Sequence, residues 1–299
     1  MSVFRSALAN TLQKTLDKLP MDHFDSKLDL RKVYDEDTMD GAYTDDLEIG
    51  GPGLASEKAE GSEISLQSIA EGAFTRYMAR TFASKVIISE EAMEDVKYKE
   101  AISAGKMLNA AMFQTADVDS ALQFSRAWDT GYTFGDGLAM FSASHTLPHG
   151  GTFSNTLATA MSPSRAAIIV AESQATGLPG HNSVTAGYML TTIVCPKEQK
   201  AAWSVVVNST HAPEAGQFNA INTVNRDMDL TVVSLKHWDT TSTNWFVKTD
   251  CENGLRWLWR VKPKGRSWIN NDFTEMRYAN RARWARGMSD PRCAIGSQA

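Results

Sequence analysis

The sequence predicts an α+β protein, and three observations lead to this class. A long stretch after Ser89 contains no proline, and its apolar residues have the spacing of one helix over 98–126. The last forty residues alternate large apolar and basic side chains, which is typical of half-buried strands. The strand-like runs between these segments do not alternate regularly with helices, so the rhythm of a parallel βαβ sheet is missing.

The composition is that of a globular protein. Of the 299 residues, 42% are hydrophobic and 22% charged, which is enough for one large or two ordinary domains. The formal net charge of −5 excludes a protein whose whole surface binds polyanions. The three cysteines (Cys195, Cys251 and Cys293) lie far apart, so we expect free thiols rather than a disulfide framework or a zinc site. We find neither a secretory signal nor a membrane span.

The predicted long helix has a clear start signal. Ser89 has the character of an N-cap, and Glu90 and Glu91 complement the helix dipole. Read over 98–126, the helix would be about 43 Å long at 1.5 Å per residue. Gly105 permits a close crossing with another element. The apolar spacing predicts a buried face made of Ala101, Ala104, Leu108, Ala111, Met112, Thr115, Val118 and Leu122.

The segment 35–62 is rich in Asp, Glu, Gly and Ser, and 63–88 mixes β-branched and aromatic residues with turn formers. We expect a long arm and an extended hairpin without a core of their own. A loop of this length is uncommon in a compact monomer, so it is expected to become ordered on a neighbouring molecule.

The middle of the chain predicts a second helix and several short strands. Ser162 before Pro163 indicates a helix that starts there and ends near Gly177. The runs 188–195, 230–235 and 244–250 have strand composition. For 196–207 two interpretations stay open, because a proline opens a helix-like segment whose end, "WSVVV", has strand composition. Near the C-terminus, Trp257 and Trp259 are two residues apart and so share one face of a strand.

The stretch "GDGLAMFSASHTLPHGGTFSN" at 135–155 allows three interpretations. Ser142 or Ser144 could pair with His145 and Asp136 as in a serine hydrolase, but the GxSxG elbow is missing. His145 and His149 have metal-ligand spacing on a helix, but Pro148 lies between them. We favour a structural loop and expect no enzymatic activity, no cofactor and no metal. In that loop, turns with positive φ are expected at Gly135, Gly137, Gly150 and Gly151.

Charge is unevenly distributed. Residues 21–60 carry twelve acidic and four basic side chains, whereas 255–299 carry ten basic and three acidic ones. The basic region is interleaved with apolar residues, unlike a flexible nucleic-acid-binding arm. DNA contact stays an alternative, but we favour pairing of the acidic with the basic segment, within one chain or between copies.

Three motifs in order carry a resemblance to a known family. They are "ISEEAMEDVKYKEAI" before the long helix, "GDGLAMFSASHTLPHGGTFSN" after it, and the closing "GLRWLWRVKPKGRSW…DFTEMRYANRARWARGMSDPR". Together they resemble the major head (major capsid) protein of Mu-like and related tailed phages. The resemblance covers roughly 60–299 and is weaker within 165–245.

This resemblance implies an α+β chain with the Hong Kong-97 capsid fold. It assigns 1–46 to an N-terminal arm and 47–86 to the extended E-loop, a hairpin that lies over a neighbouring subunit. It assigns 87–161 to the P domain, with the spine helix and its connecting loop, and 162–249 to the A domain. Residues 250–299 would return to the P domain as strands.

The implied function is that of a tailed-phage major capsid protein. Copies would assemble as pentamers and hexamers into an icosahedral head that encloses double-stranded DNA without sequence-specific binding. The implied partners are other copies, a separate scaffold protein, a portal and a decoration protein, with no membrane; the location is the virion, after assembly in the host cytoplasm. Alternatives are a cargo-enclosing nanocompartment of the same fold and a serine hydrolase.

Charged residues are the expected intersubunit contacts. No covalent cross-link is predicted from Lys58 to Asn270 or Asn271. The expected contact residues are Asp45, Asp46, Glu57, Lys58, Glu60, Arg76, Arg277, Arg281 and Arg283.

Overall fold

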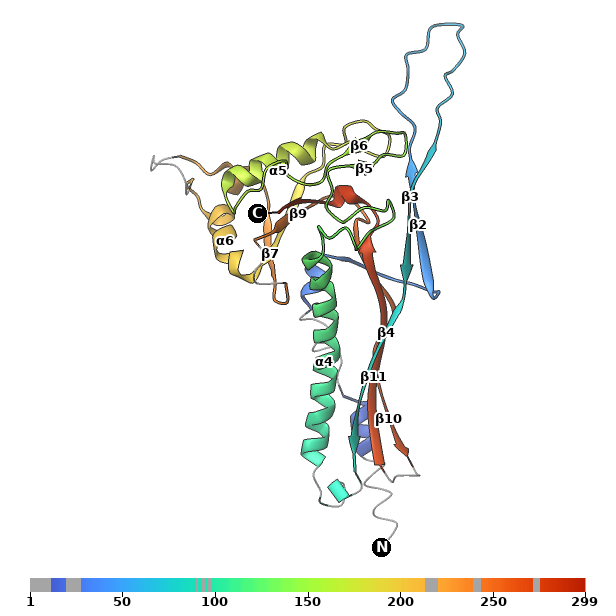
Figure 1. Ribbon diagram of the computed structural model, residues 1–299, viewed down its shortest axis with the longest axis vertical. Coiled ribbons are helices and arrows are strands. Elements are labelled where there is room, and N and C mark those ends of the chain that lie inside the picture. The colour runs from blue at the N-terminus through green and yellow to red at the C-terminus, as the bar shows by residue number, and fades with distance from the viewer. Residues whose placement is uncertain are drawn as a thin grey trace.

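The computed structural model describes residues 12–19, 28–89, 91–92, 95, 98–212, 220–238, 243–270 and 275–298. The chain forms two lobes and a projecting hairpin (Figure 1). A long sheet with one long helix beside it makes the elongated lobe. A second sheet with several short helices makes the other lobe, and the hairpin extends beyond both.

The elongated lobe contains the C-terminal strands that the sequence predicts. Its sheet has the order β1-β10-β11-β4, formed by β1 (Asp35–Thr38), β10 (Leu255–Asn270), β11 (Glu275–Met288) and β4 (Arg80–Ile88). β1 pairs parallel with β10, and the other neighbours are antiparallel. Helix α4 (Tyr98–Ser125) packs along this sheet, so the predicted long helix is confirmed (Figure 1).

The predicted buried face of α4 is wrong in part. Ala101 and Met112 are buried, but Ala111 and Val118 are exposed. The face that packs on the sheet carries Asn109, Asp119 and Gln123, whose side chains are hydrogen-bonded to the strands or to Tyr34. Because those partners bind the side-chain oxygens, the helix buries a polar stripe that hydrophobic spacing does not detect.

The second lobe is built on a sheet of order β12-β9-β7-β8. Its strands are β7 (Leu190–Pro196), β8 (Thr231–Leu235), β9 (Trp245–Thr249) and the C-terminal β12 (Ala294–Ser297). Its helices are α5 (Arg165–Gly177), the 3-10 turn η2 (Lys197–Gln199), α6 (Lys200–Asn208) and α7 (Thr223–Asp227). The strands predicted in 188–195, 230–235 and 244–250 are thus present, and the ambiguous "WSVVV" is helical.

The start of α5 differs from the prediction. Ser164, and not Ser162, is the N-cap: its hydroxyl accepts a hydrogen bond from the Ala167 backbone N–H at 3.2 Å. Pro163 therefore precedes the cap instead of occupying the first helical position. At the other predicted cap, the Ser89 hydroxyl accepts from the Ala92 N–H at 3.3 Å, while Glu90 lies outside the described residues.

Strand pairing crosses the predicted domain boundaries at three places. The hairpin consists of β2 (Tyr43–Gly50) and β3 (Ala70–Met78) around a tip at 51–69, and β4 belongs to the long sheet, whereas the E-loop was expected over 47–86. The expected arm at 1–46 includes β1 and the 3-10 turn η1 (Asp29–Lys32), and Leu30 is fully buried; 1–11 and 20–27 lie outside the described residues. The expected P-domain strands at 250–299 include β12, which joins the second lobe through β9.

The loop after α4 is ordered by a small hairpin and by the core. β5 (His145–Thr146) pairs with β6 (Thr152–Phe153), and φ is positive at Gly137, Gly150 and Gly151 but not at Gly135. One apolar cluster, which includes Phe124, Trp257 and Phe246, runs from the elongated lobe into the second sheet. The two lobes therefore share a continuous core. A last 3-10 turn, η3 (Pro291–Cys293), connects β11 to β12.

Candidate assembly surfaces and the base of the hairpin

The β2–β3 hairpin exposes many apolar side chains. Nine of the nineteen exposed large apolar side chains among the described residues lie in 43–78, and Leu66 at its tip is 98% exposed. An exposed apolar concentration of this kind marks an interaction surface in a soluble protein. The nine are Tyr43, Leu47, Ile49, Leu54, Ile64, Leu66, Ile69, Phe74 and Met78.

A basic face covers the long sheet on the side away from α4. Tyr278 and Asn280 of β11 point toward α4, where both bind Asn109, so the odd-numbered residues of β11 point the other way. Lys264 lies opposite Arg281 in the antiparallel register, and opposite residues share a face. The basic face comprises Lys85, Lys264, Arg266, Arg277, Arg281 and Arg283.

Within the part of the chain that the structure describes, most charges on the basic face have no carboxylate partner. Arg277 binds Glu275 at 3.1 Å. Within the described part of the chain, no carboxylate lies at ion-pair distance from the other five cations. A protein with a net charge of −5 thus presents a local surface that attracts anionic groups.

The expected contact residues fall into three places. Arg76 binds Asp45 across the hairpin through two hydrogen bonds of 2.7 and 2.8 Å, and Asp46 binds Arg256 of β10 at 3.1 Å, so these charges are paired within the subunit. Arg277, Arg281 and Arg283 lie on the basic face. The remaining three, Glu57, Lys58 and Glu60, lie exposed in the hairpin tip. Whether any of the nine contacts a neighbouring copy stays a prediction.

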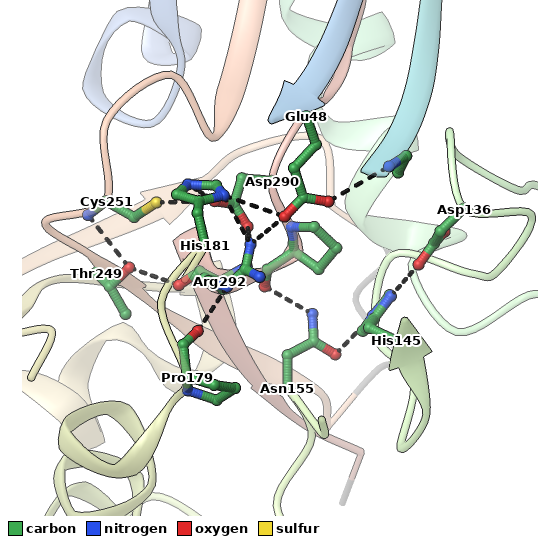
Figure 2. A network of polar contacts seen from close by, with 12 residues as sticks. Glu48, Asp136, His145, Asn155, Pro179, His181, Thr249, Cys251, Asp290 and Arg292 are labelled. Atoms are coloured by element: carbon green, nitrogen blue, oxygen red, sulfur yellow. Dashed lines mark hydrogen bonds and ion pairs between the residues drawn. The ribbon is translucent and has the colours of Figure 1, made fainter. Parts of the chain in front are cut away.

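A buried ionic cluster lies at the base of the hairpin (Figure 2). The side chain of Arg292 is fully buried, and its Nη1 atom lies 2.7 Å from Glu48 and 3.0 Å from Asp290. Its Nε atom donates to the Pro179 carbonyl oxygen at 2.7 Å. His181 lies beside both carboxylates. We call Glu48, His181, Asp290 and Arg292 the base cluster; it joins β2, the loop after α5 and the turn after β11.

Hydrogen-bond geometry indicates the charge state of His181. Its Nδ1 lies 3.1 Å from Glu48 and its Nε2 lies 3.2 Å from Asp290, so both ring nitrogens donate and the imidazole is cationic. The hydrogen bonds to Asp290 and Glu48 raise the pKa of His181 to about 9. Two cations then balance two carboxylates. The 3.4 Å approach of Arg292 Nη1 to His181 Nδ1 is therefore a contact of like charges that the carboxylates compensate.

The carboxylates of the base cluster are held in the ionised form. Burial alone would raise the pKa of Asp290, but the hydrogen bond from His181 and the charge of Arg292 outweigh burial and lower that pKa to about 2. The pKa of Glu48 is lowered by the same two partners against the same cost of burial. Charge pairing therefore dominates desolvation at this site.

The residues of the suspected serine hydrolase site are arranged differently from a triad. His145 is fully buried; its Nδ1 contacts Asp136 at 2.5 Å, as the motif suggested, but its Nε2 contacts Asn155 at 3.1 Å. A nucleophilic serine would occupy the position that Asn155 takes. The hydroxyl of Ser142 accepts instead from the Ser144 backbone N–H. Asn155 also donates to the Pro291 carbonyl, which connects this loop to the base cluster (Figure 2).

Sequence reasoning missed the base cluster because its members are far apart in the chain. Glu48 and Arg292 are separated by 244 residues. The one available signal was the closing motif "SDPR", which contains Asp290 and Arg292 but gives no indication of their partners. In the described part of the chain no group of three or more His, Cys, Asp or Glu side chains could hold a metal ion. None of the described helices is long and apolar enough to cross a bilayer.

Comparisons with known proteins find the likeness in structure rather than in sequence. No protein-family model and no curated protein matches the chain. A solved capsid of a native GTA particle matches with a TM-score of 0.53 and 16% identity, over 91% of this chain and 90% of that chain. The capsid of cyanophage P-SCSP1u matches with a TM-score of 0.51 and 13% identity, over 88% and 85%.

A third likeness comes from a virus-like particle. The crystal structure of this particle from Pyrococcus furiosus matches with a TM-score of 0.51 and 7% identity, over 96% of this chain and 98% of that chain. Each of the three comparisons covers at least 85% of both chains. This chain therefore has the Hong Kong-97 fold of tailed-phage major capsid proteins, with mixed helix and sheet as the sequence predicted.

Proposed function

We propose that this chain is the major capsid protein of a tailed phage. Many copies assemble as pentamers and hexamers into an icosahedral head around double-stranded DNA. The observation that carries the proposal is the projecting hairpin. It exposes many apolar side chains, has no core of its own, and belongs to a chain with a capsid fold. Such a surface marks a site that another molecule covers, and in a shell that molecule is a neighbouring copy.

Charge complementarity supports a contact between the hairpin tip of one copy and the basic face of the next. In one subunit the tip and the free ends of β10 and β11 lie at opposite ends of the molecule, so this contact must form between copies (Figure 1). Each arm of the tip has nine residues and so spans about 30 Å at ~3.3 Å per residue. Residues 260–268 of β10 have the same length. The tip carries three negative charges, at Glu57, Glu60 and Glu63, against one positive charge at Lys58.

The remaining partners and the location follow from this assignment. A separate scaffold protein, a portal and a decoration protein are proposed partners, and the capsid of the virion, assembled in the host cytoplasm, is the proposed location. DNA is enclosed without sequence-specific contacts. We also propose that the chain is not an enzyme; a serine-reactive probe is expected to leave it unlabelled, and the His145→Ala variant is expected to show the same background with a model ester as the parent.

Replacing the hairpin tip tests the proposal. In the variant, an Asn-Gly turn replaces 51–69, which keeps the Gly50–Ala70 end of the β2–β3 ladder. We expect a subunit that folds with the same circular dichroism as the parent and forms no stable shells in negative-stain electron microscopy. Normal closed shells from this variant would overturn the assignment of the hairpin as the assembly element.

A shell that encloses cargo instead of a genome is the second candidate. It is favoured by the likeness to the Pyrococcus furiosus virus-like particle, which covers almost the whole of both chains. Nuclease digestion of particles purified from their natural source separates the two functions. Protected double-stranded DNA of genome length supports the phage capsid, and particles with protein cargo and no protected DNA support the alternative.

A further inference from the structure

The base of the β2–β3 hairpin contacts two other parts of the subunit besides the strands that continue it. Glu48 enters the base cluster, and the turn between β5 and β6 lies against the glycines at the end of β2. We propose that Arg292 is a positioning residue that fixes the direction of the hairpin by holding Glu48. The consequence for shell assembly rests on the proposed function, but the direction itself is a property of the single subunit.

The register of the hairpin aims Glu48 at Arg292. Thr44, Asp46 and Glu48 alternate along β2 on the side that faces the body of the subunit, and Asp46 already binds Arg256 there. Between Leu47 and Ile49 the ladder shifts, because Leu47 pairs with Phe74 but Ile49 pairs with Glu71. β3 therefore has one extra residue opposite Glu48, and a bulge of this kind redirects a side chain and bends the strand.

Gly72 makes room for the carboxylate at this bulge. A Cβ atom at Gly72 would lie 2.8 Å from Glu48 Oε2 and 2.8 Å from Pro148 Cγ. Such a contact is shorter than real Cβ atoms make. The glycine thus lets the Glu48 carboxylate and the β5–β6 turn approach the hairpin at the same point.

The β5–β6 turn is the second support. His149 Nε2 donates to the Gly51 carbonyl oxygen at 2.9 Å, and a Cβ atom at Gly50 would lie 2.7 Å from Pro148 Cβ. The turn thereby blocks movement of the hairpin toward it, while the base cluster resists movement away. The base cluster and the β5–β6 turn together fix the direction of the hairpin. A single flexible connection would leave that direction free.

The ionic support is rigid because several elements contact Arg292 through its Nη1 and Nε atoms. Its Nη2 atom is buried and has no hydrogen-bond partner in the described part of the chain. Besides the two carboxylates and Pro179, its guanidinium lies over the Phe153 ring at 4.8 Å, and its own carbonyl accepts from Thr249 Oγ1 at 2.7 Å. A fully buried guanidinium with fixed partners offers Glu48 one position only. Each subunit would then reach its neighbour with the hairpin already aimed, which lowers the ordering cost of assembly.

Distance measurements on the unassembled subunit test this inference. Cysteines at Ala55 on the tip and Ser173 on α5, both exposed, carry spin labels, and the three native cysteines are buried. Glu48→Ala removes the ionic support without leaving Arg292 unpaired, because Asp290 remains. Glu71→Ala is the matched control, since Glu71 is an exposed hairpin glutamate outside the base cluster.

We expect the distance between the two spin labels to have a narrow distribution in the labelled parent and in Glu71→Ala. In Glu48→Ala we expect this distribution to be at least twice as broad. Glu48→Gln retains an oxygen that accepts from Arg292, so it is expected to restore most of the narrow distribution. If Glu48→Ala does not fold, Glu48→Met takes its place, because it keeps the length of the side chain but has no oxygen that accepts from Arg292: broadening relative to the parent supports the inference. An unchanged distribution in a folded Glu48→Ala, or in Glu48→Met when the alanine variant is unfolded, would overturn it. Because no shell is needed, this result is independent of whether the protein forms a capsid.

Discussion

Arg292 is the residue on which the buried polar contacts converge. Taking a guanidinium out of water costs several kcal/mol, and close charge pairing offsets this cost. Here two carboxylates, one carbonyl oxygen and an aromatic ring contact it, while its Nη2 atom has no hydrogen-bond partner in the described part of the chain. His181 supplies the second positive charge that leaves Glu48 and Asp290 balanced. The four groups therefore act as one unit whose stability depends on pH.

The pH dependence of this unit has a definite sign. His181 has a raised pKa, so its contribution is complete below its ordinary value of 6.5 and is lost as the pH rises through about 9. Asp290 has a lowered pKa, so its contribution is present above about 3.8 and is lost as the pH falls toward 2. The base cluster contributes most to the free energy of unfolding between these two windows.

We expect the free energy of unfolding to fall by about 1–2 kcal/mol between pH 6.5 and 9 because of His181. This value is discounted for solvent screening, since the His181 side chain is 44% exposed. The His181→Asn variant is expected to lose this part of the pH dependence. Urea denaturation of both proteins across the range measures it, and parallel curves for parent and variant would contradict the assignment.

Residue-level roles were the least predictable from sequence. The motif at 135–155 indicated that Asp136 could contact His145, and this is correct because both residues lie in one short loop. It could not place Asn155 instead of a serine at the other ring nitrogen, since that depends on how the β5–β6 hairpin folds back. Glu48 gave no signal at all: it is one acid in an acidic segment, and the bulge that aims it depends on a strand more than twenty residues later.

At the scale of elements, α4 shows what hydrophobic spacing can and cannot find. Its length was predictable because no proline interrupts the segment. Its buried face was not, because the sheet supplies partners for polar residues on that face. Asp119 alone receives hydrogen bonds from Arg80, Trp284 and Arg286. A polar stripe that binds a basic sheet is indistinguishable, in sequence, from a solvated one.

The connecting loop gives a prediction at the same scale. A Cβ atom at Gly135 would lie 2.2 Å from Thr75 Oγ1 and 2.8 Å from the Phe74 carbonyl oxygen, so Gly135→Ala must push the loop away from β3. We expect a loss of about 1–3 kcal/mol in the free energy of unfolding, as for other overpacking substitutions. Gly177→Ala is the matched control, because nothing lies within 4 Å of its added Cβ atom. Thermal unfolding measures both, and equal midpoints would show that the loop yields without cost.

At the scale of the whole molecule, strands that are distant in the sequence pair with one another and organise the two lobes. The C-terminal strand β12 leaves the elongated lobe and pairs with β9, and β1 pairs with β10 more than two hundred residues away. The sequence predicted the strands but not these pairings, because pairing depends on long-range register. It did predict a hairpin without a core of its own, and nine large apolar side chains of 43–78 are exposed in the described part of the chain. Under the proposed function, a neighbouring copy covers this surface.

Charge reversal tests how the exposed surface is covered. Lys264→Glu with Arg281→Glu changes one row of the basic face, both exposed and without carboxylate partners in the described part of the chain, so folding is expected to be unaffected. Each exposed pair contributes only about 0–1 kcal/mol, but repulsion at both positions raises the concentration needed for shells by roughly tenfold or more at low salt. High salt is expected to reduce this difference.

The complementary reversal identifies the partner. Glu57→Lys with Glu60→Lys on the hairpin tip is expected to impair assembly alone and to restore it when combined with the reversed basic face, because the two surfaces regain opposite charge. Lys99→Glu with Lys106→Glu on α4 changes the net charge by the same amount as the reversal of the basic face and serves as the control. Combining this control with the reversed hairpin tip is expected not to restore assembly. Light scattering against protein concentration measures all of these variants. A combined variant no better than either parent reversal would mean that the tip docks elsewhere on the neighbouring copy, since a contact between these two surfaces requires that their effects depend on each other.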